Sequence, residues 1–223
     1  MPASETPNLD FAASLFDMDG TLVDSTALVE QEWKEWAKTK GLDSESVARS
    51  SHGRRTEDVI RQYFPLADLD HEISTFIRLA SSLDQTVAGP VPGAVQFVRG
   101  LVPHPWAVVT SAPQAIARQR LAQCGFPEPP VLIGADDVRF GKPDPEGYLT
   151  AARRLQANVS DCLVFEDAPS GIESARRAQI RVVALETTHS RNQLLSCVVV
   201  RDFRDLQVAD IGGGKLRLMI ASE

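Results

Sequence analysis

Cysteine is scarce in this 223-residue sequence, which contains three, at positions 124, 162 and 197. An odd number, with no pair at zinc-site spacing, argues against a disulfide framework and against a thiolate metal site. Cys162 and Cys197 lie in apolar runs, where cysteine behaves as a small buried hydrophobic residue. This pattern is typical of a reducing compartment, so we expect a cytoplasmic protein.

Long apolar runs and positive charge are also lacking. No run approaches the ~20 apolar residues that a membrane-spanning helix needs, so no membrane partner is expected. The opening segment MPASETPNLD has neither a basic start nor an apolar stretch, which predicts a short disordered lead-in rather than a secretory signal. Acidic residues outnumber basic ones, for a formal net charge of −7. Because a nucleic-acid-binding protein generally shows a basic patch, no nucleic-acid partner is expected.

Short apolar runs alternate with amphipathic segments of helical period over most of the chain. Hydrophobic residues make up 43% of the sequence and charged residues 24%, which excludes a disordered chain. Alternating strands and helices predict an α/β fold with a Rossmann-like parallel-sheet core. The expected strands are 11–16, 106–109, 131–133, 162–165, 181–185 and 198–200, and the expected helices of the core are 94–100, 114–124, 145–156 and 171–178. The residues after 200 are expected to form a C-terminal tail.

One long helical block interrupts this alternation after the first strand. A helix is expected from residue 24 or 25, with Asp24 or Ser25 as its cap, to Gly41, and residues 43–88 have helical spacing throughout. The segment GPVPG at 89–93 is the strongest break in the sequence. We therefore expect a core built from residues 1–24 and 90–223 and an inserted all-helical domain at 25–89.

Polar residues follow the expected strands at the points where each strand ends. Because ligands bind beyond the carboxyl ends of the strands in an open parallel sheet, these side chains are expected to face one crevice. They are Asp17 and Asp19 after the first strand, Thr110 and Ser111 after the second, Lys142 after the third, and Glu166 and Asp167 after the fourth.

This set of residue types favours phosphoryl chemistry. Asp17 and Asp19 lie two apart on an extended segment and point the same way, and Mg²⁺ with oxygen ligands would relieve their repulsion, with Asp167 as a further ligand. Lys142 and a hydroxyl of Thr110 or Ser111 can neutralise and hydrogen-bond phosphoryl oxygens. One acid can act as a nucleophile and the other as general acid and base.

Four segments of the sequence resemble the four motifs of the haloacid dehalogenase (HAD) superfamily. They are FDMDGTLVD at 16–24, VTS at 109–111, GKPDP at 141–145 and VFEDAPSG at 164–171. They occur in the family's order and cover the core from about residue 11 to 185. A single Asp-x-Asp-Gly-Thr would be weak evidence, whereas four motifs in order, each at a strand end, form a specific pattern.

The resemblance implies a role for each motif residue. Asp17 is the nucleophile and a ligand of Mg²⁺, and Asp19 is the general acid and base and gives its backbone carbonyl to the metal. Thr110 or Ser111 and Lys142 bind the phosphoryl group. Asp167 is a metal ligand, and Glu166 acts close by, through water or Lys142.

The helical block at 25–89 is similar to the C1 caps of this superfamily, which close over the substrate. Its segment His52-Gly53-Arg54-Arg55-Thr56 looks like the substrate loop of such a cap, and at most one of the two arginines is expected to face inward. Together with the motifs, this loop resembles the subgroup that acts on sugar phosphates and glycerol phosphate. We therefore expect a Mg²⁺-dependent phosphatase of a small phosphorylated sugar or polyol that works through an aspartyl-phosphate intermediate.

Four rival functions remain. A phosphosugar mutase of the β-phosphoglucomutase type carries a histidine shortly after the first motif, and residues 24–30 have none. A dehalogenase lacks the second acid, which is Asp19 here. A phosphonate hydrolase needs a Schiff-base lysine in the cap, where the early block offers Lys34, Lys38 and Lys40. A receiver-like binding module would have no cap. A small phosphorylated metabolite is the expected partner, and a monomer is the default state.

Overall fold

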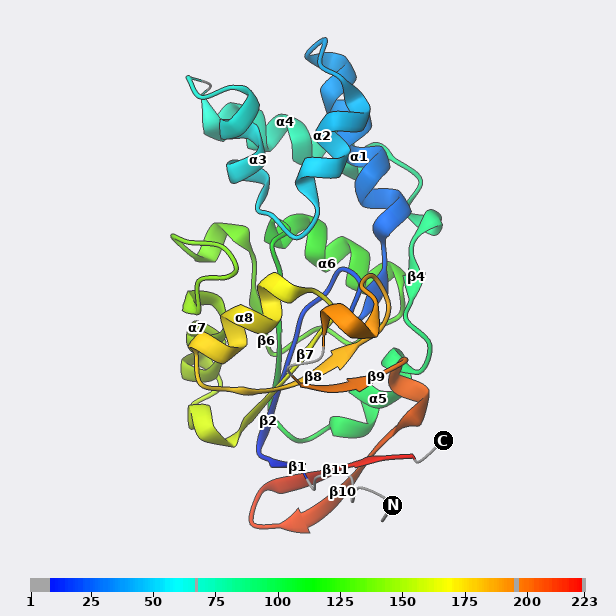
Figure 1. The fold of residues 1–223 in the computed structure, drawn as a ribbon, viewed down its shortest axis with the longest axis vertical. Helices are drawn as coiled ribbons and strands as arrows, with labels where there is room; N and C mark the ends of the chain where they lie inside the picture. The colour runs from blue at the N-terminus through cyan, green and yellow to red at the C-terminus, as the bar shows by residue number, and fades with distance from the viewer. Residues whose placement is uncertain (1–8, 67, 195–196, 222–223) are drawn as a thin grey trace.

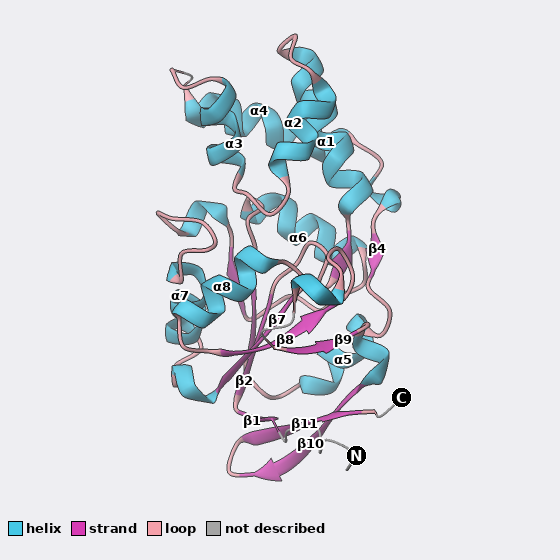
Figure 2. Cartoon of the chain, viewed as in Figure 1, coloured by secondary structure: helices cyan, strands magenta, loops and turns pink. Residues whose placement is uncertain are grey.

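A six-stranded parallel sheet forms the centre of the molecule (Figures 1 and 2). The computed structural model describes residues 9–66, 68–194 and 197–221. Neighbouring strands run in the order β6-β5-β2-β7-β8-β9, and every pair is parallel. The strands are β2 (Ala13–Phe16), β5 (Trp106–Val109), β6 (Val131–Ile133), β7 (Cys162–Glu166), β8 (Arg181–Leu185) and β9 (Val198–Val200). The predicted α/β class is confirmed.

Helices cover both faces of this sheet because successive residues of a buried strand point to opposite faces. Phe16 and Phe165 pack on the side of α5 (Ala94–Leu101) and α6 (Gln114–Gln123). Leu15 and Val164 pack on the side of α7 (Glu146–Arg154) and α8 (Pro169–Arg177). Short 3₁₀ turns lie between elements at Gln85–Val87, Ala135–Asp137, Val159–Asp161, Arg191–Gln193 and Phe203–Asp205.

Four helices stand above the carboxyl ends of the strands (Figure 1). They are α1 (Thr26–Thr39), α2 (Ser44–Ser51), α3 (Thr56–Tyr63) and α4 (Leu69–Ser82), as the helical spacing predicted. They enclose an apolar cluster that includes Trp33, Trp36, Val59, Ile60 and Phe76. The chain enters this block through β3 (Val23–Asp24) and leaves it through β4 (Gly89–Pro90), which pair with each other as antiparallel strands.

The two ends of the described chain meet in a second sheet, which the sequence did not predict. The expected strand 11–16 is two strands, because β1 (Leu9–Phe11) ends before β2 begins, and the expected tail is a hairpin of β10 (Leu206–Gly212) and β11 (Lys215–Ile220). The sheet order is β1-β11-β10. Leu216 and Leu218 alternate with polar residues and are buried, so the tail prediction was wrong. Of the expected lead-in, residues 1–8 lie outside the described residues, and Leu9 and Asp10 belong to β1.

No helix among the described residues has the length and apolar character needed to cross a bilayer.

Candidate active site

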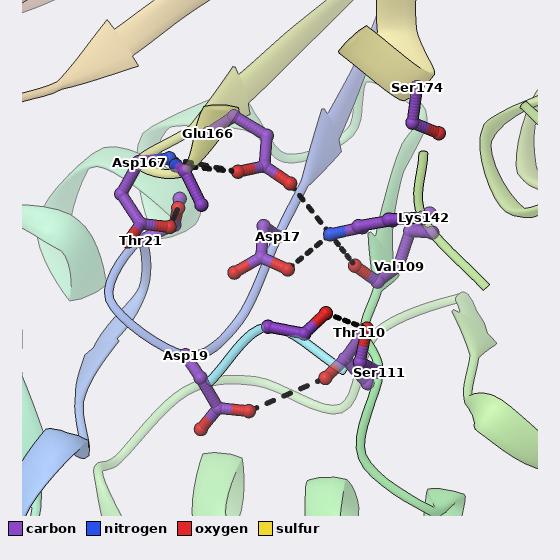
Figure 3. A network of polar contacts seen from close by, with 12 residues as sticks. Asp17, Asp19, Thr21, Val109, Thr110, Ser111, Lys142, Glu166, Asp167 and Ser174 are labelled. Atoms are coloured by element: carbon purple, nitrogen blue, oxygen red, sulfur yellow. Dashed lines mark hydrogen bonds and ion pairs between the residues drawn. The ribbon is translucent and has the colours of Figure 1, made fainter. Parts of the chain in front are cut away.

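The loops at the carboxyl ends of β2, β5 and β7 meet below the α1–α4 block and border one cavity. The structure brings together all seven residues predicted for the core site, since each of them lines this cavity: Asp17, Asp19, Thr110, Ser111, Lys142, Glu166 and Asp167. Figure 3 shows most of their contacts. Val29, Trp33, Phe76 and Ile116 add apolar surface to the lining.

Asp17 and Lys142 form a buried ion pair at the floor of the cavity. The ammonium of Lys142 donates to Oδ1 of Asp17 and to the carbonyl of Val109 at 3.2 Å. Burial raises the pKa of Asp17 well above its ordinary value, although the Lys142 charge opposes this rise. Burial alone would lower the pKa of Lys142, but the charges of Asp17 and Glu166 outweigh it and raise that pKa well above its ordinary value. Lys142 is therefore a permanent cation in this site.

Glu166 is fully engaged by its neighbours. Its Oε1 accepts hydrogen bonds from Lys142 at 2.7 Å and from the hydroxyl of Tyr148 at 2.9 Å. Its Oε2 accepts from the backbone N–H groups of Asp167 at 3.0 Å and Ala168 at 3.1 Å. Because both oxygens are occupied, Glu166 serves to hold Lys142 and the start of α8 in place.

Asp167 is held by two hydroxyls. Thr21 donates to its Oδ1 at 3.0 Å, and Thr188 donates to its Oδ2. Burial, followed by the charge of Glu166, raises the pKa of Asp167 to about 7. Gly20 lies against this carboxylate with φ at +87°, so a side chain at position 20 would collide with Asp167. The DGT sequence of the first motif thus packs directly onto the acid of the fourth.

The acidic residues fit a divalent cation with oxygen ligands. Asp17, Glu166 and Asp167 each offer a carboxylate oxygen within 4.8 Å of the others, and all three are buried. Lys142 is the cation in contact with two of them, while burial and, after it, repulsion by neighbouring carboxylates raise the pKa values of Asp17 and Asp167. Hard carboxylate oxygens are the ligands that Mg²⁺ prefers. Since Glu166 is already saturated, Asp17 and Asp167 are the side chains available to such an ion.

Asp19 faces the same cavity but makes separate contacts. Its Oδ1 accepts from the hydroxyl of Ser25 at 2.6 Å and from the guanidinium of Arg120. Its Oδ2 is 3.5 Å from the hydroxyl of Thr110. Ser25 occupies the expected cap position of α1, yet its side chain makes no capping bond. The expected cap residue is therefore confirmed in position, but its hydroxyl is directed to Asp19 instead of to the helix backbone.

Thr110 and Ser111 use their hydroxyls in different ways. The Thr110 oxygen accepts from the backbone N–H of Ala112 at 3.1 Å, while its proton is directed to Asp19. Ser111 donates to the carbonyl of Gly53 at 3.1 Å, so it joins the core to the α2–α3 loop (Figure 3).

The predicted substrate loop divides between two positions. Gly53 and Arg54 line the active-site cavity, whereas His52 lines a neighbouring cavity that shares Asp19 and Asp167. Arg54 is tied within the block by bonds to Ser50, Asp58 and Gln62. Arg55 does not line this cavity and donates to the carbonyls of Val138 and Arg139.

Several site residues were not predicted from the sequence. Tyr148 lies under the ammonium of Lys142, with its ring centre 5.2 Å away. Thr188 holds Asp167, and Glu32 and Arg120 line the cavity together. Tyr148 follows the third motif by a few residues, which is a usable signal. Arg120 is one of two arginines in an ordinary helix, and nothing in the sequence separates it from Arg118.

Residues 11–179 match the family model of haloacid dehalogenase-like hydrolases. The chain is 36% identical to hexitol phosphatase A of Escherichia coli over 176 residues, or 77% of this chain and 81% of that protein. It is also 36% identical to validoxylamine A 7'-phosphate phosphatase of Streptomyces hygroscopicus over 210 residues, or 91% of this chain and 99% of that protein.

Among solved structures, the fold is similar to that of a protein described as a putative β-phosphoglucomutase from Thermotoga maritima. The TM-score is 0.63 and the identity 26%, over 85% of this chain and 94% of that one.

Proposed function

The chain belongs to the haloacid dehalogenase-like hydrolase family, and on that premise we propose that it is a phosphatase of small phosphorylated sugars or polyols. The observation that carries this proposal is the convergence of Asp17, Asp19 and Lys142 on one cavity with the hydroxyls of Thr110 and Ser111. These are a nucleophile, an acid, a cation and two hydrogen-bond donors, which together are the groups that phosphoryl transfer through an enzyme carboxylate needs.

In the proposed first step, a carboxylate oxygen of Asp17 attacks the phosphorus of the ester. A bond forms between Asp17 and phosphorus while the bond from phosphorus to the ester oxygen breaks, and Asp19 gives its proton to that oxygen. Lys142 touches Oδ1 of Asp17, where its charge opposes the rise that burial causes in the pKa of this carboxyl and neutralises charge on the phosphoryl oxygens. Ser111 would exchange its bond to the Gly53 carbonyl for one to the phosphoryl group.

In the second step, Asp19 takes a proton from water, and the resulting hydroxide attacks the aspartyl phosphate. Phosphate leaves and Asp17 is regenerated as a carboxylate. Mg²⁺, which would be held by Asp17, Asp167 and the backbone carbonyl of Asp19, would supply further neutralisation of negative charge at the phosphoryl group. Thr21 and Thr188 orient Asp167 for that role.

The substrate class rests on the cavity and on the relatives. We propose that residues 25–89 act as a cap domain whose α2–α3 loop borders the leaving group, through Gly53 and Arg54 in one cavity and His52 in the next. The active-site cavity encloses about 90 Å³, which suits a small ester. The relatives at 36% identity are named for a hexitol phosphate and for the 7'-phosphate of validoxylamine A, which supports a polyol or sugar phosphate here.

The proposed function is tested by assaying phosphate release in the presence of Mg²⁺. The substrates are p-nitrophenyl phosphate, hexitol phosphates, hexose phosphates and glycerol phosphates. Hydrolysis is expected to disappear in Asp17→Asn, to fall strongly in Asp19→Asn, and to stop with EDTA. Glu173→Gln, a change of a partly exposed carboxylate in α8 that pairs with Arg176 and Arg177, is the control and should leave the rates unchanged. Phosphate release that survives Asp17→Asn or EDTA would refute the mechanism.

A phosphosugar mutase is the second candidate, favoured by the structural similarity to the putative β-phosphoglucomutase. A mutase would convert a hexose 1-phosphate to the 6-phosphate without releasing phosphate. We expect release instead, because the segment after the first motif has no histidine. Phosphorus NMR of the reaction with glucose 1-phosphate separates the two outcomes.

A further inference from the structure

A buried arginine joins Asp19 to the helical block. Arg120, in α6, is 1% exposed, and its two terminal nitrogens reach different carboxylates. Nη1 donates to Oδ1 of Asp19, and Nη2 donates to Oε1 of Glu32 at 2.6 Å. Glu32 belongs to α1 and is 3% exposed, so the contact passes from the core to the helical block inside the protein. All three side chains line the active-site cavity.

A contribution to the stability of the fold does not by itself explain the buried charges of Arg120 and Glu32. Taking ions out of water is costly, and a buried ion pair stabilises a fold no better than well-packed apolar residues would. Arg120 carries a further cost, because its Nε has no hydrogen-bond partner among the described residues. What the guanidinium does provide is orientation, since its planar fork holds each carboxylate in a restricted geometry.

The two oxygens of Asp19 have unequal surroundings. Oδ1 is occupied by Arg120 and by the hydroxyl of Ser25 at 2.6 Å. For Oδ2, the contact made by the described residues is the hydroxyl of Thr110 at 3.5 Å, which is the outer limit of a hydrogen bond. The Asp19 side chain is 29% exposed. One oxygen is therefore fixed and the other remains available in the cavity.

We propose that Arg120, itself held by Glu32, is a positioning residue that fixes Asp19 so that Oδ2 exchanges the proton with the leaving group. This inference rests on the proposed phosphatase function. As the bond from phosphorus to the ester oxygen breaks, the proton passes from Oδ2 to that oxygen, while Arg120 touches neither. Because Glu32 comes from α1, the acid is oriented only while the helical block rests on the core as it does in this structure.

The test compares two aryl esters that differ in their need for an acid. p-Nitrophenyl phosphate releases a stabilised phenolate that needs little protonation, whereas phenyl phosphate releases a more basic one. In Arg120→Met, kcat/KM for phenyl phosphate is expected to fall about 100-fold, a typical contribution of general acid catalysis, and that for p-nitrophenyl phosphate less than about tenfold. Asp19→Asn should show the same selectivity and sets its upper limit.

Three further variants separate positioning from structure. Arg120→Lys keeps the charge but lacks the planar fork whose two terminal nitrogens reach Asp19 and Glu32 separately, and Glu32→Gln keeps the shape but loses the ion pair. Each should change the ratio of the two kcat/KM values in the same direction as Arg120→Met, by about threefold or more. Arg118→Met removes an exposed arginine of α6 that pairs with Glu128, and it should leave the ratio unchanged.

Arg120→Lys and Glu32→Gln test the positioning role of Arg120 even if Arg120→Met fails to fold. Equal losses for the two esters in Arg120→Lys and Glu32→Gln, or no loss, would overturn the role of Arg120. Absence of phosphate release by the unaltered protein would instead refute the phosphatase function, and release that persists in Asp17→Asn would refute its proposed mechanism. The two failures are therefore distinguishable.

Discussion

At the scale of single residues, the site depends on the charge of Lys142. Its ammonium contacts Asp17 and Glu166, and its side chain is 9% exposed. Removing one partner of a buried ion pair leaves the other charge without compensation. Lys142→Met is therefore expected to reduce the free energy of unfolding by about 3–5 kcal/mol. It should also lower kcat by about 10²–10³-fold, through lost stabilisation of the phosphoryl group.

Chemical denaturation and steady-state kinetics measure these two effects of Lys142→Met. Lys38→Met is the matched control, because Lys38 is exposed and pairs with Glu35 on the surface of α1. It should change stability by less than about 1 kcal/mol and leave kcat unaltered. Normal stability together with normal kcat in Lys142→Met would contradict the assignment of this lysine.

Gly171 is the second residue whose identity the site requires. An added Cβ there would overlap the carboxylate of Glu166, which is 1% exposed and bound on both oxygens. Gly171→Ala must displace Glu166 and is expected to cost about 1–3 kcal/mol, the usual penalty of overpacking, together with much of the activity. Gly100→Ala in α5 meets open space and should be neutral or stabilising by up to about 1 kcal/mol. In thermal unfolding, the melting temperature should therefore fall in Gly171→Ala and should stay unchanged or rise in Gly100→Ala.

At the scale of elements, β11 is stabilised through one of its faces. Leu218 is 2% exposed and pairs with Leu9 of β1, whereas the adjacent Met219 is 41% exposed. Leu218→Ala is expected to cost about 2–5 kcal/mol of unfolding free energy, as for other large-to-small changes in a core. Met219→Ala should cost less than about 0.5 kcal/mol. Urea unfolding measures both, and equal effects would contradict the alternation of this strand.

The pairing of the β10–β11 hairpin with β1 could not be predicted from the sequence. Leucines alternate with basic residues at 215–218, but the partner strand β1 lies about two hundred residues earlier in the chain. A strand is stabilised by its neighbours, so an isolated alternating run does not reveal its pairing. The strands β5, β6, β8 and β9 of the six-stranded sheet were predicted with their observed bounds because each is a short run of mainly apolar residues.

Only some residues of the candidate site could be predicted from the sequence, namely those that directly follow strands. Asp17, Lys142 and Asp167 follow strands, and the carboxyl ends of parallel strands meet at one edge of the sheet. Arg120 and Glu32 lie inside helices, eighty-eight positions apart, and only the tertiary fold brings them together. The motif residues could therefore be found from the sequence, whereas the residues that orient them could not.

At the scale of the whole molecule, the proposed Mg²⁺ site should couple metal binding to folding. An ion that binds only the folded state, at a free concentration tenfold above its Kd, stabilises that state by about 1.4 kcal/mol. For a chain of this length, the melting temperature should rise by about 3–5 °C. Asp167→Asn should abolish the rise, and Glu35→Gln on the surface of α1 should retain it. A rise that persists in Asp167→Asn would place the ion elsewhere.

The pairing of β3 with β4 would allow the segment between these two strands to be replaced by another. Asp24 and Gly89 are direct partners in this two-stranded ribbon, so the segment between them leaves and rejoins the core at neighbouring points. Paired strands lie only ~4.8 Å apart. Any segment with equally close ends could be exchanged at this place without altering the path of the strands that carry Asp17 and Asp167. Under the proposed function, the segment that borders the leaving group could then be transplanted as one stretch of chain, provided that the new segment supplies a partner for Arg120 in place of Glu32.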